Sequence, residues 1–555
     1  MQFPRFTRRT VAACLAVAAL GSPPAHAATQ QEVTEAVTAG AAWLRTQQNA
    51  TTGQLAGFGG DYALSALSAA GVHPADAHGP GAGDPSAQDH YAGVWAAQAT
   101  PSSTAILFGS AAGIDVQRVS ASTNLVALLA TAYHRAGELD GAFGDGATNL
   151  TAFSALALAR AGAPAPVLAK SNAYLRGQQH DDGGWNFGRV ATDAQRAAAS
   201  SVDMTGVALA ALCQTGAGAS DPDVRAGLSL LEGRQDPATG ALGNVDSTGW
   251  AVSGLNACGV DPHGGRFTTA AGTTPADYLL SQQDAGGAFT FGGSPNLYST
   301  QNAVRALAGE AFSADLPRRA AAGDPRFRPV PVVADGTPTP HALAVDDGAG
   351  DVRFCSVTAP AGATLAAFLA AAEASSSPEA CVASSTIANG SVTEVNGREG
   401  GWRLRLNRAP EQLAVESRTV AFGDTVLLRL PVSAGGAQGV PGPAGADGAP
   451  GAAGPAGPTG ATGPAGAPGA AGPAGPAGAR GERGPLGRIT CRARSPRRVS
   501  CRVAARSRAT LTRRGRVYAA GTASRLRARR AVRPGRYTLR LVIRGRRVAL
   551  PVTVR

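Results

Sequence analysis

Helices and glycine-rich turns alternate in a unit that recurs from about residue 30 to residue 311. In each unit a polar helix is followed by a turn such as Asp182-Gly-Gly-Trp-Asn-Phe-Gly188, and then by an apolar helix that stops at a glycine. Glycine is favoured after a helix because it adopts the left-handed conformation without steric cost. Six helix pairs can be counted from the glycines that end them: Gly71, Gly113, Gly162, Gly216, Gly259 and Gly309.

The second helix of each unit is apolar on nearly all sides, as residues 205–212 illustrate. Such a helix needs packing partners all round, whereas first helices such as the one over residues 222–232 keep a charged face. Units of this kind cannot bury their apolar faces alone, so they must stack on their neighbours. Six pairs are enough to close into a ring, and we expect an all-α toroid of α6/α6 type over residues 28–313.

The turns, above all Gln178-Gln179 followed by Gly183-Gly-Trp185, resemble the Q/W repeats of squalene–hopene cyclases and protein prenyltransferases. This resemblance implies an α/α toroid. A cyclase would need an Asp-x-Asp-Asp cluster to protonate an alkene, and the matching stretch here has Asp203 alone. A prenyltransferase would need zinc held by Asp, Cys and His, but the histidines here fall on turns or outer helices. We therefore predict no catalytic residue, no metal site and no required cofactor.

Aligning the inner helices on their terminal glycines brings four polar residues into one ring at the helix N-termini: Asn149, Asp203, Asp246 and Asn296. Helix capping would explain this recurrence by itself, because Asp and Asn at an N-cap accept hydrogen bonds from free backbone N–H groups. Alternatively, the ring forms the mouth of a central cavity, where Trp250 and Tyr298 add aromatic surface for a bulky ligand. The two interpretations are compatible.

Residues 1–27 are typical of an export signal, with three arginines, an apolar run and the small-residue site Ala25-His-Ala27. Both a Sec signal and a twin-arginine signal, Thr7-Arg-Arg-Thr-Val11, fit this segment. No later apolar stretch is long enough to span a bilayer, so we expect a secreted or cell-surface protein. Six cysteines remain after residues 1–27, and an even number in an exported chain favours disulfides, one within each module: Cys213 with Cys258, Cys355 with Cys381, and Cys491 with Cys501.

After a Pro-rich linker over residues 314–340, residues 341–433 alternate as strands around one helix, which predicts a small α+β domain. Its Asn396-Gly397 turn, Trp402 and the order of its strands are similar to the C-terminal β-domain of transcobalamin and intrinsic factor. In those carriers the domain follows an α6/α6 ring and cobalamin is held between the two. The resemblance implies a corrinoid or another bulky amphiphile as ligand, with Trp402 and the Asn396-Gly397 turn closing over it.

From Gly439 to Gly487 every third residue is glycine, without interruption, within a segment that we assign to residues 434–487. Only glycine fits at the axis of a triple helix, so this period predicts a collagen-like segment and a homotrimer.

The last module, residues 488–555, alternates basic and apolar residues and is expected to form a small β-sandwich. It contains 22 Arg and no acid. The whole chain has a net charge of +12, and residues 1–27 hold three more arginines, so residues 28–487 carry a net charge of −13. We expect this basic module to bind an anionic cell-envelope polymer. Export and a near absence of aromatic residues for base stacking argue against nucleic acid.

These features predict a non-catalytic binding protein that is displayed on a collagen-like stalk, by resemblance a cobalamin-type carrier. One alternative is an enzyme of the toroid superfamily that uses Asp203 and Asp246, which occupy equivalent places in adjacent repeats. Another is a purely structural surface protein, for which an obstructed ring cavity would be the indicator.

Overall fold

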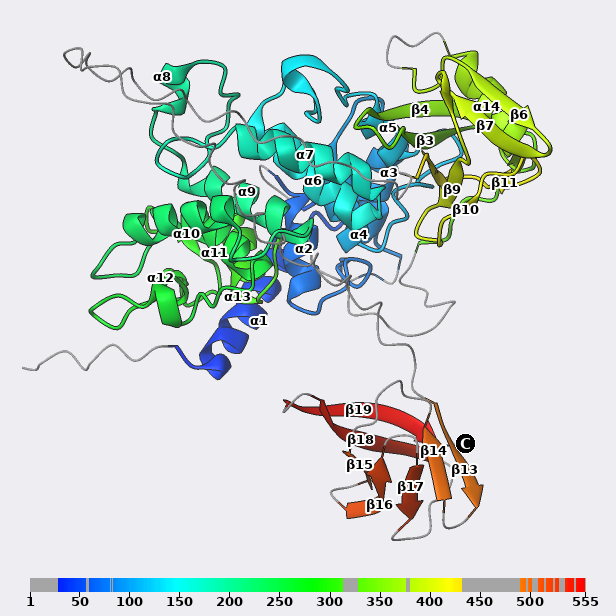
Figure 1. Ribbon diagram of the computed structural model, residues 1–555. Coiled ribbons are helices and arrows are strands. Elements are labelled where there is room, and N and C mark those ends of the chain that lie inside the picture. The colour runs from blue at the N-terminus through cyan, green and yellow to red at the C-terminus, as the bar shows by residue number, and fades with distance from the viewer. Residues whose placement is uncertain are drawn as a thin grey trace, which may run out of the picture. The chain divides into compact units, whose positions relative to one another are not determined.

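The computed structural model describes residues 28–55, 59–79, 81, 83–312, 328–375 and 380–431, and the strands between residues 490 and 554 (Figure 1). It forms two compact units, Met1–Gly442 and Pro443–Arg555. The predicted export signal, and the collagen-like segment over residues 439–487, lie outside the described residues. Within the described part, no helix is long and apolar enough to cross a membrane.

Six inner helices form a closed ring in the first unit. Each inner helix packs against the next one along the chain, and the last packs back against the first. Their side chains are buried almost all round, as the unbroken buried run from Met204 to Leu212 shows. The helices of the ring are α2 (Tyr62–Ala69), α4 (Ser103–Ala111), α6 (Thr148–Ala161), α9 (Val202–Gln214), α11 (Val245–Ala257) and α13 (Leu297–Leu307).

The outer helices cover this ring, and all but the wholly apolar α5, which packs against β3 and β4, carry polar side chains. A capping box between Thr29 and Glu32 starts the first of them, and Thr274 and Asp277 start the last in the same way. The chain thus has an all-α toroid in its N-terminal part. The outer helices are α1 (Gln30–Thr46), α3 (Ala87–Ala96), α5 (Leu125–Ala130), α7 (Ala165–Gly177), α10 (Pro222–Arg234) and α12 (Pro275–Ser281), while the short α8 (Asp193–Arg196) lies in a connection.

A glutamine after the outer helix joins consecutive repeats. Gln179 Nε2 donates to Gly183 O in its own turn at 2.8 Å and to Asp223 O in the next repeat at 2.9 Å. Gly183 has a φ of +90°, and a Cβ there would lie 3.0 Å from Ala226, so the turn and the next helix approach too closely for a side chain. The same pair of hydrogen bonds recurs at Gln48, Gln235 and Gln283.

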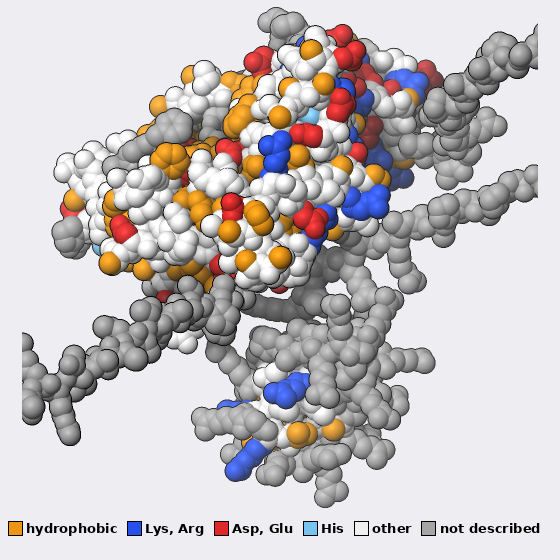
Figure 2. Space-filling model, turned by 90° about the vertical axis from the view of Figure 1, so that its left-hand side faces the viewer, with side chains coloured by type: hydrophobic (Ala, Val, Ile, Leu, Met, Phe, Trp, Pro, Cys, Tyr) orange, Lys and Arg blue, Asp and Glu red, His pale blue; other side chains and the backbone are white. Residues whose placement is uncertain are grey.

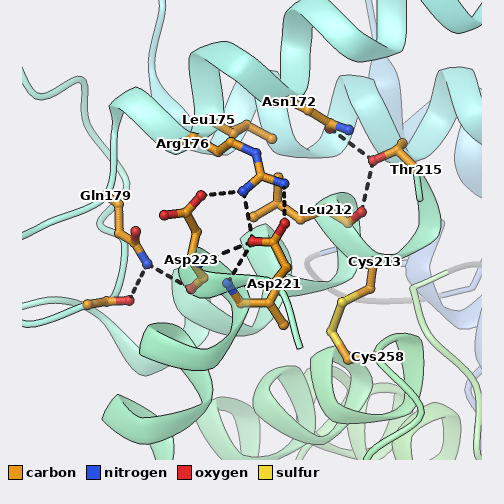
Figure 3. A network of polar contacts seen from close by, with 12 residues as sticks. Asn172, Leu175, Arg176, Gln179, Leu212, Cys213, Thr215, Asp221, Asp223 and Cys258 are labelled. Atoms are coloured by element: carbon orange, nitrogen blue, oxygen red, sulfur yellow. Dashed lines mark hydrogen bonds and ion pairs between the residues drawn. A yellow bond between two sulfur atoms is a disulfide. The ribbon is translucent and has the colours of Figure 1, made fainter. Parts of the chain in front are cut away.

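Charged side chains add to one of these joints (Figure 3). Arg176 at the end of α7 makes two hydrogen bonds with Asp221, of 2.8 and 2.9 Å, and also pairs with Asp223. Arg176 holds the pKa of Asp221 below its usual value. Bidentate pairing of this kind is stronger than a single ion pair.

The aromatic residues of the turns are structural. Trp185 and Phe289 are fully buried. The backbone N–H of Trp185 donates to Thr205 Oγ1 at 3.1 Å, and that of Phe289 donates to Thr300 Oγ1 at 2.9 Å. A threonine in the first turn of the inner helix therefore holds the aromatic residue of the preceding turn.

A five-stranded sheet in the order β10-β9-β12-β3-β4 follows the toroid. Strand β3 begins at Pro338, so the linker expected over residues 314–340 extends too far, because Pro338 to Pro340 already pair with β4. The main strands are β3 (Pro338–Asp346), β4 (Val352–Pro360), β9 (Arg403–Leu406), β10 (Gln412–Leu413) and β12 (Thr425–Arg429), and α14 (Leu365–Glu373) packs on β4. Shorter strands are β5 (Ala363–Thr364), β6 (Ser385–Ala388), β7 (Ser391–Val395), β8 (Arg398–Glu399) and β11 (Thr419–Val420), and β1 (Thr290–Phe291) with β2 (Ser294–Pro295) forms a hairpin in the toroid.

Both faces of this sheet are buried. Leu343 and Val345 of β3 point into the core with α14, while Ala342 and Ala344 alternate with them and join the core of the toroid. Strands β3 and β4 lie beside α5 (Figure 1).

Polar contacts border the junction between sheet and toroid, as between Gln117 Nε2 and Thr425 Oγ1 at 2.6 Å.

On the face shown in Figure 2, acidic and basic side chains lie next to one another and no wide area carries a single charge.

The second unit is a closed barrel in the order β13-β14-β17-β16-β15-β18-β19. We expected two packed sheets; instead β13 pairs in parallel with β19 and the sheet closes on itself, which leaves no free edge. The strands are β13 (Thr490–Ser495), β14 (Arg498–Cys501), β15 (Arg508–Arg513), β16 (Arg516–Thr522), β17 (Arg525–Ala528), β18 (Gly535–Ile543) and β19 (Arg546–Val554).

Two of the three expected disulfides are present. Cys213 and Cys258 link α9 to the end of α11 (Figure 3), and Cys355 and Cys381 link β4 to the connection before β6. Cys491 and Cys501 stand opposite each other in the register of β13 and β14. Their disulfide stays a prediction.

Candidate functional site

The predicted polar ring lies at the N-terminal ends of the inner helices, which we call the mouth of the toroid. The N-caps of α9 and α11 are Ser201 and Asn244, whose side chains accept from the backbone of the first turn. Asp203 and Asp246 come two residues later. The capping interpretation is therefore wrong for both, and also for Asn149, because α6 starts after Ala147.

Asn296, by contrast, caps α13, and its side chain accepts from the backbone N–H of Ser299 at 3.0 Å. Capping is confirmed there. Counted from the caps, the residue of α13 that matches Asp203 and Asp246 is Tyr298 rather than Asn296. The ring of equivalent positions thus consists of Asn149, Asp203, Asp246 and Tyr298, which are all partly buried.

Two carboxylates at the mouth have a raised pKa. Burial raises the pKa of Asp246, and the negative charge of Asp203 on the neighbouring helix adds to that rise, so the two acids interact across adjacent repeats. Asn302 Nδ2 lies 3.4 Å from Asp246 Oδ1. Burial also raises the pKa of Asp61, which directly precedes α2. An acid of this kind keeps its proton to higher pH than a free carboxyl group.

Below the mouth, aromatic rings from alternate repeats meet. Tyr62, Phe153 and Trp250 each stand nine residues before the glycine that ends their helix. The ring centroid of Phe153 lies 6.5 Å from that of Tyr62 and 5.8 Å from that of Trp250, both in edge-to-face geometry.

Two more rings complete this aromatic layer. Tyr298 lies 5.9 Å from Tyr62 and 6.5 Å from Trp250, and Phe312, which is fully buried, lies 5.6 Å from both Phe153 and Trp250. Side chains thus fill the ring at this level, where an open cavity had been expected. A ligand at the mouth would rest on the aromatic layer.

Arg305 of α13 places a guanidinium group inside the ring, and its side chain is fully buried. Its Nη2 donates to Asn302 Oδ1 at 3.0 Å, and its guanidinium lies 4.8 Å from the centre of the Phe312 ring. Burial lowers the pKa of Arg305 to about 10, so the side chain is still charged at neutral pH.

The site residues expected in the β-domain lie elsewhere. Asn396 and Gly397 have φ of +53° and +77° and form the two-residue turn between β7 and β8. Trp402 is fully buried in the core of the β-domain, and its Nε1 donates to Arg398 O at 3.0 Å. Among the described residues, no hydrogen bond or ring contact links these three to Asp203, Asp246, Trp250 or Tyr298.

Sequence reasoning missed Asp61, Tyr62, Phe153, Arg305 and Phe312. The aromatic residue nine positions before the terminal glycine, in every second repeat, is a signal that would have found Tyr62 and Phe153. Arg305 stands out as a cation between Val304 and Ala306 in an inner helix. Phe312 follows the last helix and has no equivalent in the repeat. In the described part of the chain, no group of three or more His, Cys, Asp or Glu side chains is arranged to hold a metal.

A family model, the collagen triple helix repeat, matches the chain over residues 433–490 with 20 copies. The predicted collagen-like segment is confirmed. A comparison with curated proteins gives no match.

Among solved structures, the chain is similar to haptocorrin in complex with Cbi, with 12% identity over 73% of this chain and 99% of that chain, and a TM-score of 0.31. It is also similar to the type II terpene cyclase MstE from Scytonema, with 16% identity over 50% of this chain and 98% of that chain, and a TM-score of 0.34. At these identities and TM-scores the likenesses say nothing of ligand or activity.

Proposed function

We propose that this is a secreted or cell-surface protein that binds a bulky amphiphilic small molecule at the mouth of its toroid. The observation that carries this proposal is the aromatic layer of Tyr62, Phe153, Trp250 and Tyr298 beneath a rim of carboxylates. Aromatic faces with a few convergent polar groups are typical of small-molecule sites.

In this proposal the domains have separate roles. The toroid over residues 28–313 is the binding head, and the β-domain, which begins at Pro338, supports it. The collagen-like segment over residues 434–487 joins three heads on one stalk, and the basic module over residues 488–555 attaches to an anionic polymer of the cell envelope. Two disulfides and a collagen repeat agree with an extracellular protein.

A corrinoid is the first ligand to test, because the β-domain motifs, and the order of ring and β-domain, resemble cobalamin carriers. Haptocorrin, one of the similar structures, is described in complex with Cbi. The sheet packs directly on α5, so a corrinoid held between toroid and β-domain would lie beside that contact rather than within it. Trp402, being buried, would reach it only after a rearrangement.

Titration of the full mature protein with cobalamin, followed by corrin absorption, tests this version. A mouth variant, Tyr298→Ala, should weaken binding at least tenfold, whereas Asn396→Asp in the β-domain turn should not if the mouth is the site. The reverse result would move the site to the β-domain. No binding of cobalamin at micromolar concentration rejects the corrinoid, and a failure of other amphiphiles as well rejects the binding function.

A second candidate function is acid catalysis, which the raised pKa of Asp246, with Asp203 on the adjacent repeat, favours. A carboxyl group whose pKa burial raises can donate a proton to a bound substrate. Screening the protein against isoprenoid and polysaccharide substrates, with Asp203→Asn and Asp246→Asn beside it, tests this. An activity that survives both substitutions unchanged would rule out this chemistry.

A further inference from the structure

Arg305 carries a positive charge inside the ring that no carboxylate neutralises among the described residues. Its Nε lies 3.5 Å from Ser253 Oγ and its Nη2 bonds Asn302, but its buried Nη1 has no hydrogen-bond partner. Burial lowers the pKa of Arg305, and Tyr298 and Tyr62 are the neighbours that oppose this shift. Burying an ionised group without a paired charge is unfavourable, so an uncompensated guanidinium destabilises the fold.

Other unpartnered donors lie on the same side of the ring. Gln301 is fully buried, and neither its Nε2 nor its Oε1 has a partner. Gln301 and Arg305 are four residues apart on α13, so their side chains share one face of the helix. The indole Nε1 of Trp250 is also buried without a partner, and its ring contacts both Tyr298 and Phe312. The Arg305 guanidinium lies over the same Phe312 ring.

We propose that Arg305, Gln301 and Trp250 form a subsite for an anionic oxygen group, a carboxylate or a phosphate, of the molecule that the toroid binds. The subsite rests on the proposed binding function and specifies the chemistry of its ligand: an amphiphile with an acidic head group. Three N–H donors, one of them charged, would replace the water shell of such a group, and charge-assisted hydrogen bonds are about twice as strong as neutral ones.

The position of the subsite predicts how the ligand lies. Arg305 stands seven residues after Tyr298 on α13, which is about 10 Å along a helix axis. Long helical side chains point back toward the helix N-terminus, so the guanidinium reaches toward the mouth and not away from it. The acidic head group would therefore enter first and displace part of the aromatic layer, while Asp61, Asp203 and Asp246 at the rim would face the outer end of the ligand.

Three probes with one apolar chain test the head-group preference: dodecanoate, dodecyl phosphate and dodecanol, each titrated calorimetrically into the full mature protein below its aggregation concentration. We expect dodecanoate or dodecyl phosphate to bind at least tenfold tighter than dodecanol. The ratio of the two anions distinguishes a carboxylate subsite from a phosphate subsite.

Gln301→Leu should reduce this preference, and Arg305→Met should abolish it. Arg176→Met is the matched control, because Arg176 is paired with Asp221 and Asp223 on the outer surface and should leave the preference intact. Thermal unfolding separates a folding defect from a binding defect, and Arg305→Lys, which keeps the charge, should retain part of the preference if Arg305→Met does not fold.

Equal binding of the three probes to the wild-type protein, or an anion preference that survives in Arg305→Met, overturns the subsite but leaves the binding function standing. Binding of none of the probes, nor of cobalamin, overturns both. A Gln301→Leu protein with an unchanged preference would remove Gln301 from the subsite.

Discussion

The side chain of Gln283 donates a hydrogen bond to the backbone oxygen of Ala36, and the Nε2–O distance is 2.8 Å although 247 residues separate the two. This contact joins the last repeat to the first. The ring is thus closed by the same hydrogen bond that joins neighbouring repeats elsewhere, and the closing repeat needs no special motif.

Gln283→Ala should therefore destabilise the whole toroid. Loss of two hydrogen bonds, with partly buried carbonyl groups left behind, should lower the free energy of unfolding by about 1–2 kcal/mol in a urea titration. Gln282→Ala is the control, because among the described residues the side chain of Gln282 bonds only the neighbouring Ser281 side chain. Equal stability of the two variants would show that the closing contact contributes nothing.

A second closing contact joins the backbone nitrogen of Ala28 to Asp277 Oδ1 at 2.7 Å. If the export signal is removed after Ala27, this nitrogen becomes a charged amino group and the hydrogen bond becomes an ion pair. We expect mature protein that starts at Ala28 to melt at a higher temperature than protein with a residual N-terminal extension. The difference should shrink at alkaline pH, where the amino group loses its proton. Asp277→Asn should abolish the difference.

The raised pKa of Asp246 predicts a pH-dependent effect of Asp246→Asn. Because the folded protein holds the protonated form better than the unfolded chain does, the wild type loses stability as the pH rises above the usual range of an aspartate. Asp246→Asn should therefore be more stable than the wild type at pH 7 and about equal to it near pH 3.

The control for Asp246→Asn is Asp236→Asn. Hydrogen bonds from the backbone and side chain of Thr239 lower the pKa of Asp236, so this substitution should destabilise at pH 7. Unfolding curves at the two pH values measure both effects. The same sign for both variants would contradict the burial argument.

The disulfide between Cys213 and Cys258 closes a loop across 45 residues, and replacing both by Ala should lower the free energy of unfolding by about 3–4 kcal/mol.

Thiol titration of the denatured, unreduced protein should find no free cysteine in the mature chain. A free thiol in the peptides that contain Cys491 or Cys501, detected by mass spectrometry, would refute the third pair.

The collagen-like segment predicts a trimer. A Gly-x-y chain has no internal hydrogen bonds, so its glycines become useful only when three chains share one axis. Light scattering should give three chains per particle, and Gly463→Glu should lower the melting temperature of the trimer. A monomer at all concentrations would contradict this, and with it the avidity that three binding heads would provide.

The helical toroid, the strands of the β-domain and the collagen-like segment were predictable because each rests on a period that a linear pattern reveals. The terminal glycines marked the ends of the inner helices, and the Gly-x-y register marked the triple-helix repeat. The barrel was missed because the alternation of basic and apolar residues reveals strands but not whether β13 and β19 pair.

The candidate site was only half predictable. The alignment of the repeats found Asp203 and Asp246. It did not reveal that Ser201 and Asn244 cap the two helices instead, because Ser and Asn are as favourable as Asp at an N-cap. Trp402 was placed at a ligand surface on the basis of motif order, whereas the structure buries it in the core.

The sequence by itself determined the repeat, its small-residue inner helices and the tight Gln–Gly turns, because these depend on backbone conformation and local hydrogen bonds. Only the tertiary structure decided what meets at the centre of the ring. Tyr62, Phe153, Trp250, Tyr298 and Phe312 come from helices and turns far apart in the chain. Whether they enclose a cavity or fill it, and whether Arg305 finds a carboxylate there, depends on the distance between helices that closing the ring imposes, and no local pattern encodes that distance.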